Sequence, residues 1–213
     1  FLQLAPGVTT YLGQAAYLQL GYAETLSSVI ERSPELAHKE SLSRAAGAAL
    51  FKHQALVALI RDRGQDPLEL MLPFREPLDA FRQATHGIRP LETMLTVHVT
   101  AGMLDDFYLS LSGSYGETGR RAAGILRADA DRSPLVAIIT DAISADDEMR
   151  SLLSLWGRRL VGDTLLVARG ALRPNTMERP GALDRDDEKQ VEPVFTQLLG
   201  AHSRRMTSIG LDA

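Results

Sequence analysis

The chain has 213 residues, of which 45% are hydrophobic and 23% are charged, so it is long enough to form one good globular core. It contains no cysteine, which excludes disulfides, zinc–thiolate sites and iron–sulfur clusters and fits a cytoplasmic protein. The net charge of −4 argues against binding of nucleic acid through a general positive field.

Two long helices are predicted at the start of the chain, because apolar residues recur there at alternating steps of four and three. The first extends from Val8 to Arg32. The second begins at Ser33-Pro34, with Ser33 as the expected N-cap, and ends near Gly64. The buried stripe expected for this second helix is Leu42, Ala46, Ala49, His53, Leu56 and Ile60. A proline-rich connector follows, with a short amphipathic helix at 78–84.

A third helix is predicted from Pro90 to about Ser112, and it carries two adjacent apolar stripes, as a helix at the centre of a bundle does. His98 and Asp105 lie on one of these stripes. The later helices are expected at about 117–130, from Ser133 for about three turns, from Ser144 onward, and at 191–209, with a polar loop at 173–189 before the last one. The sequence therefore predicts one all-α domain over residues 1–213, with a four-helix core and one or two additional C-terminal helices.

The acidic residues and histidines decide whether such a bundle could hold two metal ions. A dimetal carboxylate site takes one Glu from each of two helices and Glu-x-x-His from each of the others, because residues i and i+3 share a helix face. Only Glu35 and His38 form this motif, at a helix start where acidic residues are favoured. His98 and Asp105 are about 10 Å apart along their helix, so they cannot easily share one ion. The chain has no P-loop, Gly-x-Gly-x-x-Gly, Gly-x-Ser-x-Gly or zincin motif.

Several stretches resemble the ferritin-like proteins that are similar to the tRNA hydroxylase acting on 2-methylthio-isopentenyladenosine. They include "LPFREPLDAF", "AGMLDDFYLSL", "LWGRRLVGDTLL" and "AHSRRMTSIGLDA", and with the stretch from Tyr22 to Ile60 they cover most of residues 20 to 213. The resemblance implies a ferritin-like four-helix bundle that, in active members, holds two irons and activates O₂ to hydroxylate a substrate.

Carried over residue by residue, the resemblance also implies which side chains would bind metal. The candidate ligands are Glu24 from the first helix, His53 from the second, Asp105 or Asp106 from the third, and Asp131 as the nearest replacement in the fourth. Leu50 occupies the glutamate position of the first Glu-x-x-His, and residues 117–143 contain no histidine for the second. Too few anionic ligands then remain for two irons.

The first hypothesis is therefore a ferritin-like protein with an eroded dimetal site and no cofactor, acting as a binding or scaffold protein. Its expected partners are an unidentified protein and a second copy of the chain, and no membrane is expected because no apolar run approaches about 18 residues. The alternative is an O₂-dependent diiron or mononuclear-metal hydroxylase that uses iron and acts on a modified tRNA base or a similar substrate. A third hypothesis, tRNA binding without chemistry, would need the arginines of 120–132, 158–159 and 204–205 to gather on one face.

Overall fold

The structure is a computed structural model that describes residues 2–128, 132–172 and 185–213. Its long helices are α1 (Val8–Arg32), α2 (Leu36–Asp62), α5 (Pro90–Leu111), α8 (Asp147–Ala171) and α9 (Arg185–Ser208). The shorter helices are α3 (Pro67–Met71), α4 (Arg75–Ala84), α6 (Gly116–Arg127) and α7 (Ser133–Ala145). Because these described parts contain helices and no strand, the all-α prediction is confirmed.

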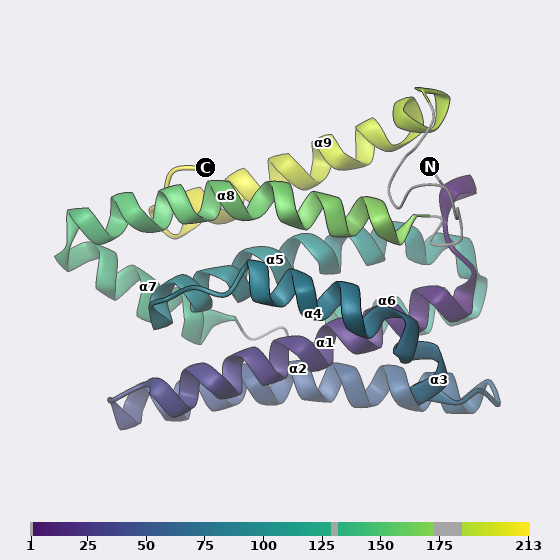
Figure 1. Cartoon of the computed structure of the whole chain (residues 1–213), viewed down its shortest axis with the longest axis horizontal. Helices are drawn as coiled ribbons and strands as arrows, with labels where there is room; N and C mark the ends of the chain where they lie inside the picture. Colours follow the sequence, from purple (N-terminus) through teal and green to yellow (C-terminus); the bar gives the residue numbers. More distant parts are fainter. Residues whose placement is uncertain (1, 129–131, 173–184) are drawn as a thin grey trace.

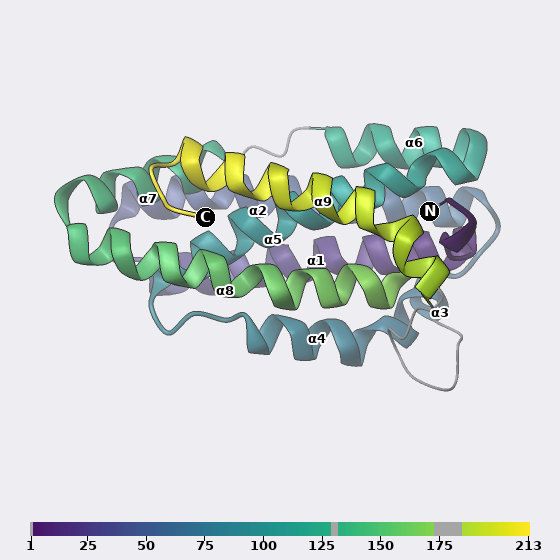
Figure 2. The ribbon, with the colours of Figure 1, turned by 90° about the horizontal axis from the view of Figure 1, so that it is seen from above.

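Helix α5 lies at the centre of the bundle. Figures 1 and 2 show it between the antiparallel pair α1–α2 on one side and the pair α8–α9 on the other. Helices α6 and α7 pack beside α2 and α5 and together take the place of the fourth core helix, while α4 packs on α1 and α8. The arrangement is the predicted four-helix core with added C-terminal helices.

The two apolar stripes predicted for α5 are buried except at Leu91 and Leu109, which are partly buried, and this explains its central position. Polar residues lie among the buried ones, and burial of a polar group is costly unless it forms a hydrogen bond. The Thr96 hydroxyl donates to the carbonyl oxygen of Thr85 at 2.8 Å, and the Thr100 hydroxyl donates to the carbonyl oxygen of Thr96 at 2.8 Å. The hydroxyl groups of both threonines therefore form hydrogen bonds, either within α5 or to the end of α4 that precedes it.

Several helix ends differ from the predicted ones. The Ser33 hydroxyl donates to the carbonyl oxygen of Val29, so Ser33 closes α1, and α2 begins later, at Leu36. Asp146, rather than Ser144, caps α8 by accepting from two backbone N–H groups of its first turn. Helix α9 begins at Arg185, earlier than expected, so the last part of the expected 173–189 loop is helical and residues 173–184 lie outside the described residues.

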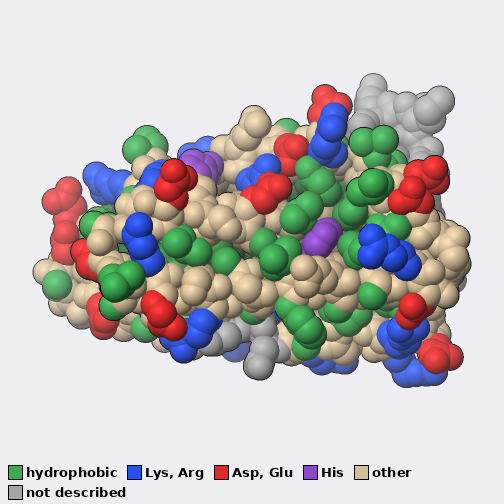
Figure 3. All heavy atoms as spheres, turned by 90° about the horizontal axis from the view of Figure 1, so that it is seen from below, with side chains coloured by type: hydrophobic (Ala, Val, Ile, Leu, Met, Phe, Trp, Pro, Cys, Tyr) green, Lys and Arg blue, Asp and Glu red, His purple; other side chains and the backbone are tan. Residues whose placement is uncertain are grey.

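The outer face of the α1–α2 pair carries exposed hydrophobic side chains. Leu36, Leu50 and Phe51 of α2 are exposed. Figure 3 shows this side of the molecule, where hydrophobic side chains lie between charged ones across the face. In the part of the chain that the structure describes, no helix is both long enough and apolar enough to cross a membrane.

Candidate functional site

A buried ion pair lies at the centre of the bundle, where α1, α2 and α5 meet. Lys52 of α2 is 2% exposed and Asp105 of α5 is 5% exposed. Lys52 Nζ donates to Asp105 Oδ2 at 3.1 Å and to the carbonyl oxygen of Leu126 at 2.7 Å. Gln19 of α1 donates through Nε2 to Asp105 Oδ1 at 2.8 Å. Both oxygens of the carboxylate are therefore held by groups from neighbouring helices.

A second cation approaches the same carboxylate. Arg132, directly before α7, places Nη1 3.6 Å from Asp105 Oδ2. This separation is too long for a hydrogen bond but short enough for a strong electrostatic interaction in a partly buried site. One carboxylate, Asp105, therefore lies between two cations, Lys52 and Arg132.

Leu42, Ala49, Leu56 and Ile60 of the predicted α2 stripe are buried, but at this centre Lys52 rather than His53 faces inward. Leu50 is 40% exposed, and His53 is only half-buried, with Nδ1 2.9 Å from the carbonyl oxygen of Ala16. Leu50 and His53 are the positions of the expected Glu-x-x-His motif. The residues that face the centre instead are Ala49 and Lys52, one position earlier in each case. The predicted stripe does not include Lys52, and lysine is almost never fully buried without a partner. The sequence signal for a buried cation was Asp105, an acidic residue on a stripe that was predicted to be buried.

The other candidate ligands have different partners. Glu24 is exposed and pairs with Arg82 of α4, and Asp106 pairs with Arg205 of α9. Asp131 lies outside the described residues. Within the described ranges, no group of three or more His, Cys, Asp or Glu side chains is placed to hold a metal ion. The residues at the centre do not fit a dimetal site, because the available carboxylate, Asp105, is already neutralised by cationic side chains.

A family model described as "Ferritin-like domain, actinomycetes" matches residues 3–173. The chain belongs to this family. No curated protein matches the chain. The resemblance stated from the sequence is thus confirmed at the level of the ferritin-like domain.

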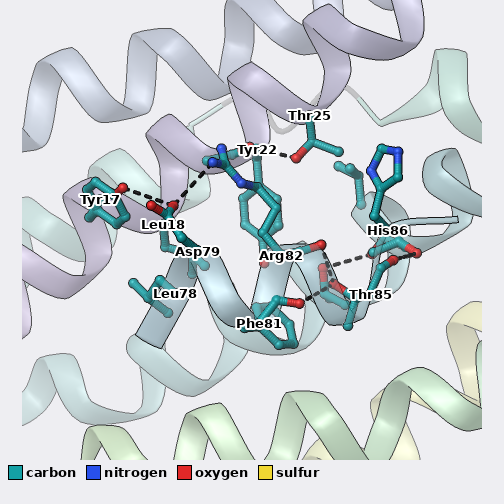
Figure 4. Close-up of a pocket in the computed structure, with 14 residues that line it drawn as sticks. Tyr17, Leu18, Tyr22, Thr25, Leu78, Asp79, Phe81, Arg82, Thr85 and His86 are labelled. Atoms are coloured by element: carbon teal, nitrogen blue, oxygen red, sulfur yellow. Dashed lines mark hydrogen bonds and ion pairs between the residues drawn. The ribbon is translucent and has the colours of Figure 1, made fainter. Parts of the chain in front are cut away.

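The ferritin-like domain has a small pocket beneath α4, between α1 and α5. Its apolar wall includes Leu78 and Phe81, and its outer end is closed by polar groups. Tyr17 Oη donates to Asp79 Oδ1 at 3.0 Å, and Arg82 Nη2 donates to the same oxygen at 3.1 Å, as Figure 4 shows. Since Arg82 also pairs with Glu24, the role of Glu24 in this structure is to fasten α4 to α1.

A cluster of histidines and arginine lies on the opposite side of α5. His98 is 7% exposed and His202 of α9 is 3% exposed, and no ring nitrogen of either forms a hydrogen bond to the described residues. Burial, and secondarily the positive charges of Arg132 and Arg205, lower the pKa of His98 to about 4. Burial also lowers the pKa of His202. Both imidazoles are therefore expected to be neutral at pH 7.

Gly102 allows Arg205 to reach Asp106 across α5. A Cβ atom on Gly102 would lie 2.5 Å from Arg205 Nε and 2.9 Å from Arg205 Cδ. Gly102→Ala is therefore expected to displace Arg205 from Asp106; since the higher helix propensity of alanine offsets part of this loss, the free energy of unfolding should fall by no more than about 1 kcal/mol, measured by urea unfolding.

The matched control for this substitution is Gly162→Ala in α8, where a new Cβ atom would meet nothing within 4 Å. It is expected to raise the free energy of unfolding by about 0.5 to 1 kcal/mol, because alanine has the higher helix propensity. Equal gains in both variants would show that Arg205 does not occupy the space above Gly102.

Proposed function

We propose that this chain is a non-catalytic ferritin-like protein, a binding or scaffold protein in which the Lys52–Asp105 ion pair replaces the dimetal centre. The observation that carries the proposal is the burial of Lys52 against Asp105. Lys52 lies in the centre of the bundle, where a dimetal carboxylate site would need anionic ligands.

Two unit charges about 4 Å apart interact by about 4 kcal/mol at an effective dielectric constant of 20, and a divalent ion doubles this interaction. A metal ion at Asp105 would therefore be repelled by Lys52 and by Arg132, and it would have to displace Lys52 from Asp105. The ion pair provides the positive charge that stabilises the buried carboxylate without any metal.

A binding role is also supported by the surface. Leu50 and Phe51 leave hydrophobic area exposed at neighbouring positions of α2, and exposed apolar area is characteristic of interaction surfaces when it is contiguous. This face supports contact with another protein or with a second copy of the chain. Self-association would bury these side chains and would be observed as a concentration-dependent mass in analytical ultracentrifugation.

The decisive test of the proposed function is metal content. The protein is expressed with added iron, purified without a histidine tag, and analysed by plasma mass spectrometry beside a diiron ferritin-like protein treated in the same way. We expect no stoichiometric iron, manganese or zinc, because Lys52 and Arg132 neutralise Asp105.

Two irons per chain would contradict this function and support the O₂-dependent hydroxylase, and assays on modified tRNA bases would then follow. One metal per chain that is lost in His53→Ala would indicate a mononuclear site.

A further inference from the structure

A cavity of about 30 Å³ lies beside the central ion pair, between α1, α2, α5 and the start of α7. Its polar lining includes Tyr22, Lys52, Asp105 and Arg132, and its apolar lining includes Ala48 and Leu135. The half-buried Ala48 places one side of the cavity near the surface of α2. The volume is enough for one or two small molecules of the size of water.

Two hydrogen-bond donors that line this cavity have no partner among the described residues. Arg132 Nη1 is buried and forms no hydrogen bond, since Asp105 Oδ2 is 3.6 Å away. The hydroxyl of Tyr22, a residue that is 7% exposed, is also buried and forms no hydrogen bond of normal geometry, although the Thr100 side chain lies close enough to influence its pKa. Buried donors without acceptors are costly, so the cavity favours an occupant that accepts hydrogen bonds.

The charge of the lining indicates what kind of acceptor fits. Lys52 and Arg132 contribute two positive charges, whereas Asp105 contributes one negative charge and already accepts through both oxygens. Asp106 does not compensate the excess, because it pairs with Arg205. The described lining therefore has a net charge of +1. In a partly buried site, water screens this charge only weakly.

We propose that Tyr22, Lys52 and Arg132 bind a small monovalent anion, of the size of chloride or formate, in this cavity beside Asp105. The size of the cavity excludes nucleotides and other large anions. The anion would join the start of α7 to α1 and α2, since Arg132 precedes α7 while Tyr22 and Lys52 belong to the other two helices. The proposal deepens the proposed function and rests on it, because it requires a metal-free centre.

The test uses the full chain, with its metal content already measured. Sodium chloride and sodium formate are titrated at constant ionic strength against sodium gluconate, whose anion is too large for the cavity, and the thermal unfolding midpoint is recorded. We expect the midpoint to rise and saturate with chloride or formate. The apparent Kd should be about tenfold weaker, or more, in Arg132→Gln, because a charge-assisted hydrogen bond is lost.

Two further variants separate this site from general salt effects. Tyr22→Phe removes only the hydroxyl and should weaken the same anion, and it keeps the test available if Arg132→Gln does not fold. Arg121→Gln is the control, because Arg121 pairs with Asp62 on the exposed surface, and it should bind the anion as the unmodified chain does. Line broadening of ¹³C-formate in NMR spectra provides a reading that does not depend on unfolding.

The outcomes distinguish the anion site from the proposed function. A midpoint that changes linearly without saturation, or saturable binding that is unchanged in both Arg132→Gln and Tyr22→Phe, would overturn the anion site and leave water as the occupant of the cavity. Stoichiometric metal found by mass spectrometry would instead overturn the proposed function, whatever the anion titration gives.

Discussion

Replacing Lys52 with methionine is expected to lower the free energy of unfolding by about 3 to 5 kcal/mol, because it leaves the Asp105 carboxylate buried without its main partner. Methionine keeps the length and flexibility of the lysine side chain, so the loss comes from charge rather than from an unfilled space. Arg132 and Gln19 remain near Asp105 and should keep the protein folded. The measurement is urea unfolding at pH 7.

The double variant Lys52→Met/Asp105→Asn separates the charge effect from packing. It removes both charges, so most of the lost stability should return, and the double-mutant cycle should give a large coupling energy between the two residues. Arg44→Met, on the exposed surface of the same helix, should change the stability by no more than about 0.5 kcal/mol. A loss below about 1 kcal/mol in Lys52→Met would mean that Lys52 does not stabilise Asp105.

The helices were predictable because periodicity reports directly which face of a helix is buried. The bounds of α1 agree with the prediction, and the wide buried arc of α5 followed from its two stripes. The chemistry of the centre was less predictable, because a lysine and a histidine were adjacent in α2 and the histidine was assigned to the core. In the structure His53 bonds to a backbone carbonyl at the edge, and Lys52 lies inside.

The partners of the acidic residues depend on long-range contacts that no local pattern contains. Glu24 and Arg82 are far apart in the chain, as are Asp106 and Arg205, yet each pair is in contact. The sequence did place Asp105 on a buried stripe and identified the cost of burying it unpaired. What it could not indicate was that the cationic side chains of Lys52 and Arg132 lie beside Asp105.

The loss of stability in mild acid is expected to depend on His98. Its pKa is about 4 in the folded chain, below the ordinary value of 6.5, so below pH 6.5 the unfolded chain binds a proton that the folded chain does not. The contribution of neutral His98 to the free energy of unfolding is complete above pH 6.5, decreases as the pH falls, and is lost once the pH is below 4. This difference corresponds to about 2 kcal/mol at pH 5 and roughly 3 kcal/mol below pH 4.

The comparison that isolates His98 is the pH dependence of urea unfolding in the unmodified chain and in His98→Gln, which cannot take up the proton. We expect the variant to be less stable at pH 7, because it has lost a packed imidazole, but to lose less stability between pH 7 and pH 5. Leu95→Ala, which weakens packing in the same helix without changing a titratable group, should keep the slope of the unmodified chain. The pKa of His202 is also lowered by burial, so the free energy of unfolding of His98→Gln should still decrease somewhat between pH 7 and pH 5. If His98→Gln keeps the full slope, His98 is already solvated or hydrogen-bonded in the folded protein, and the acid sensitivity arises from other groups.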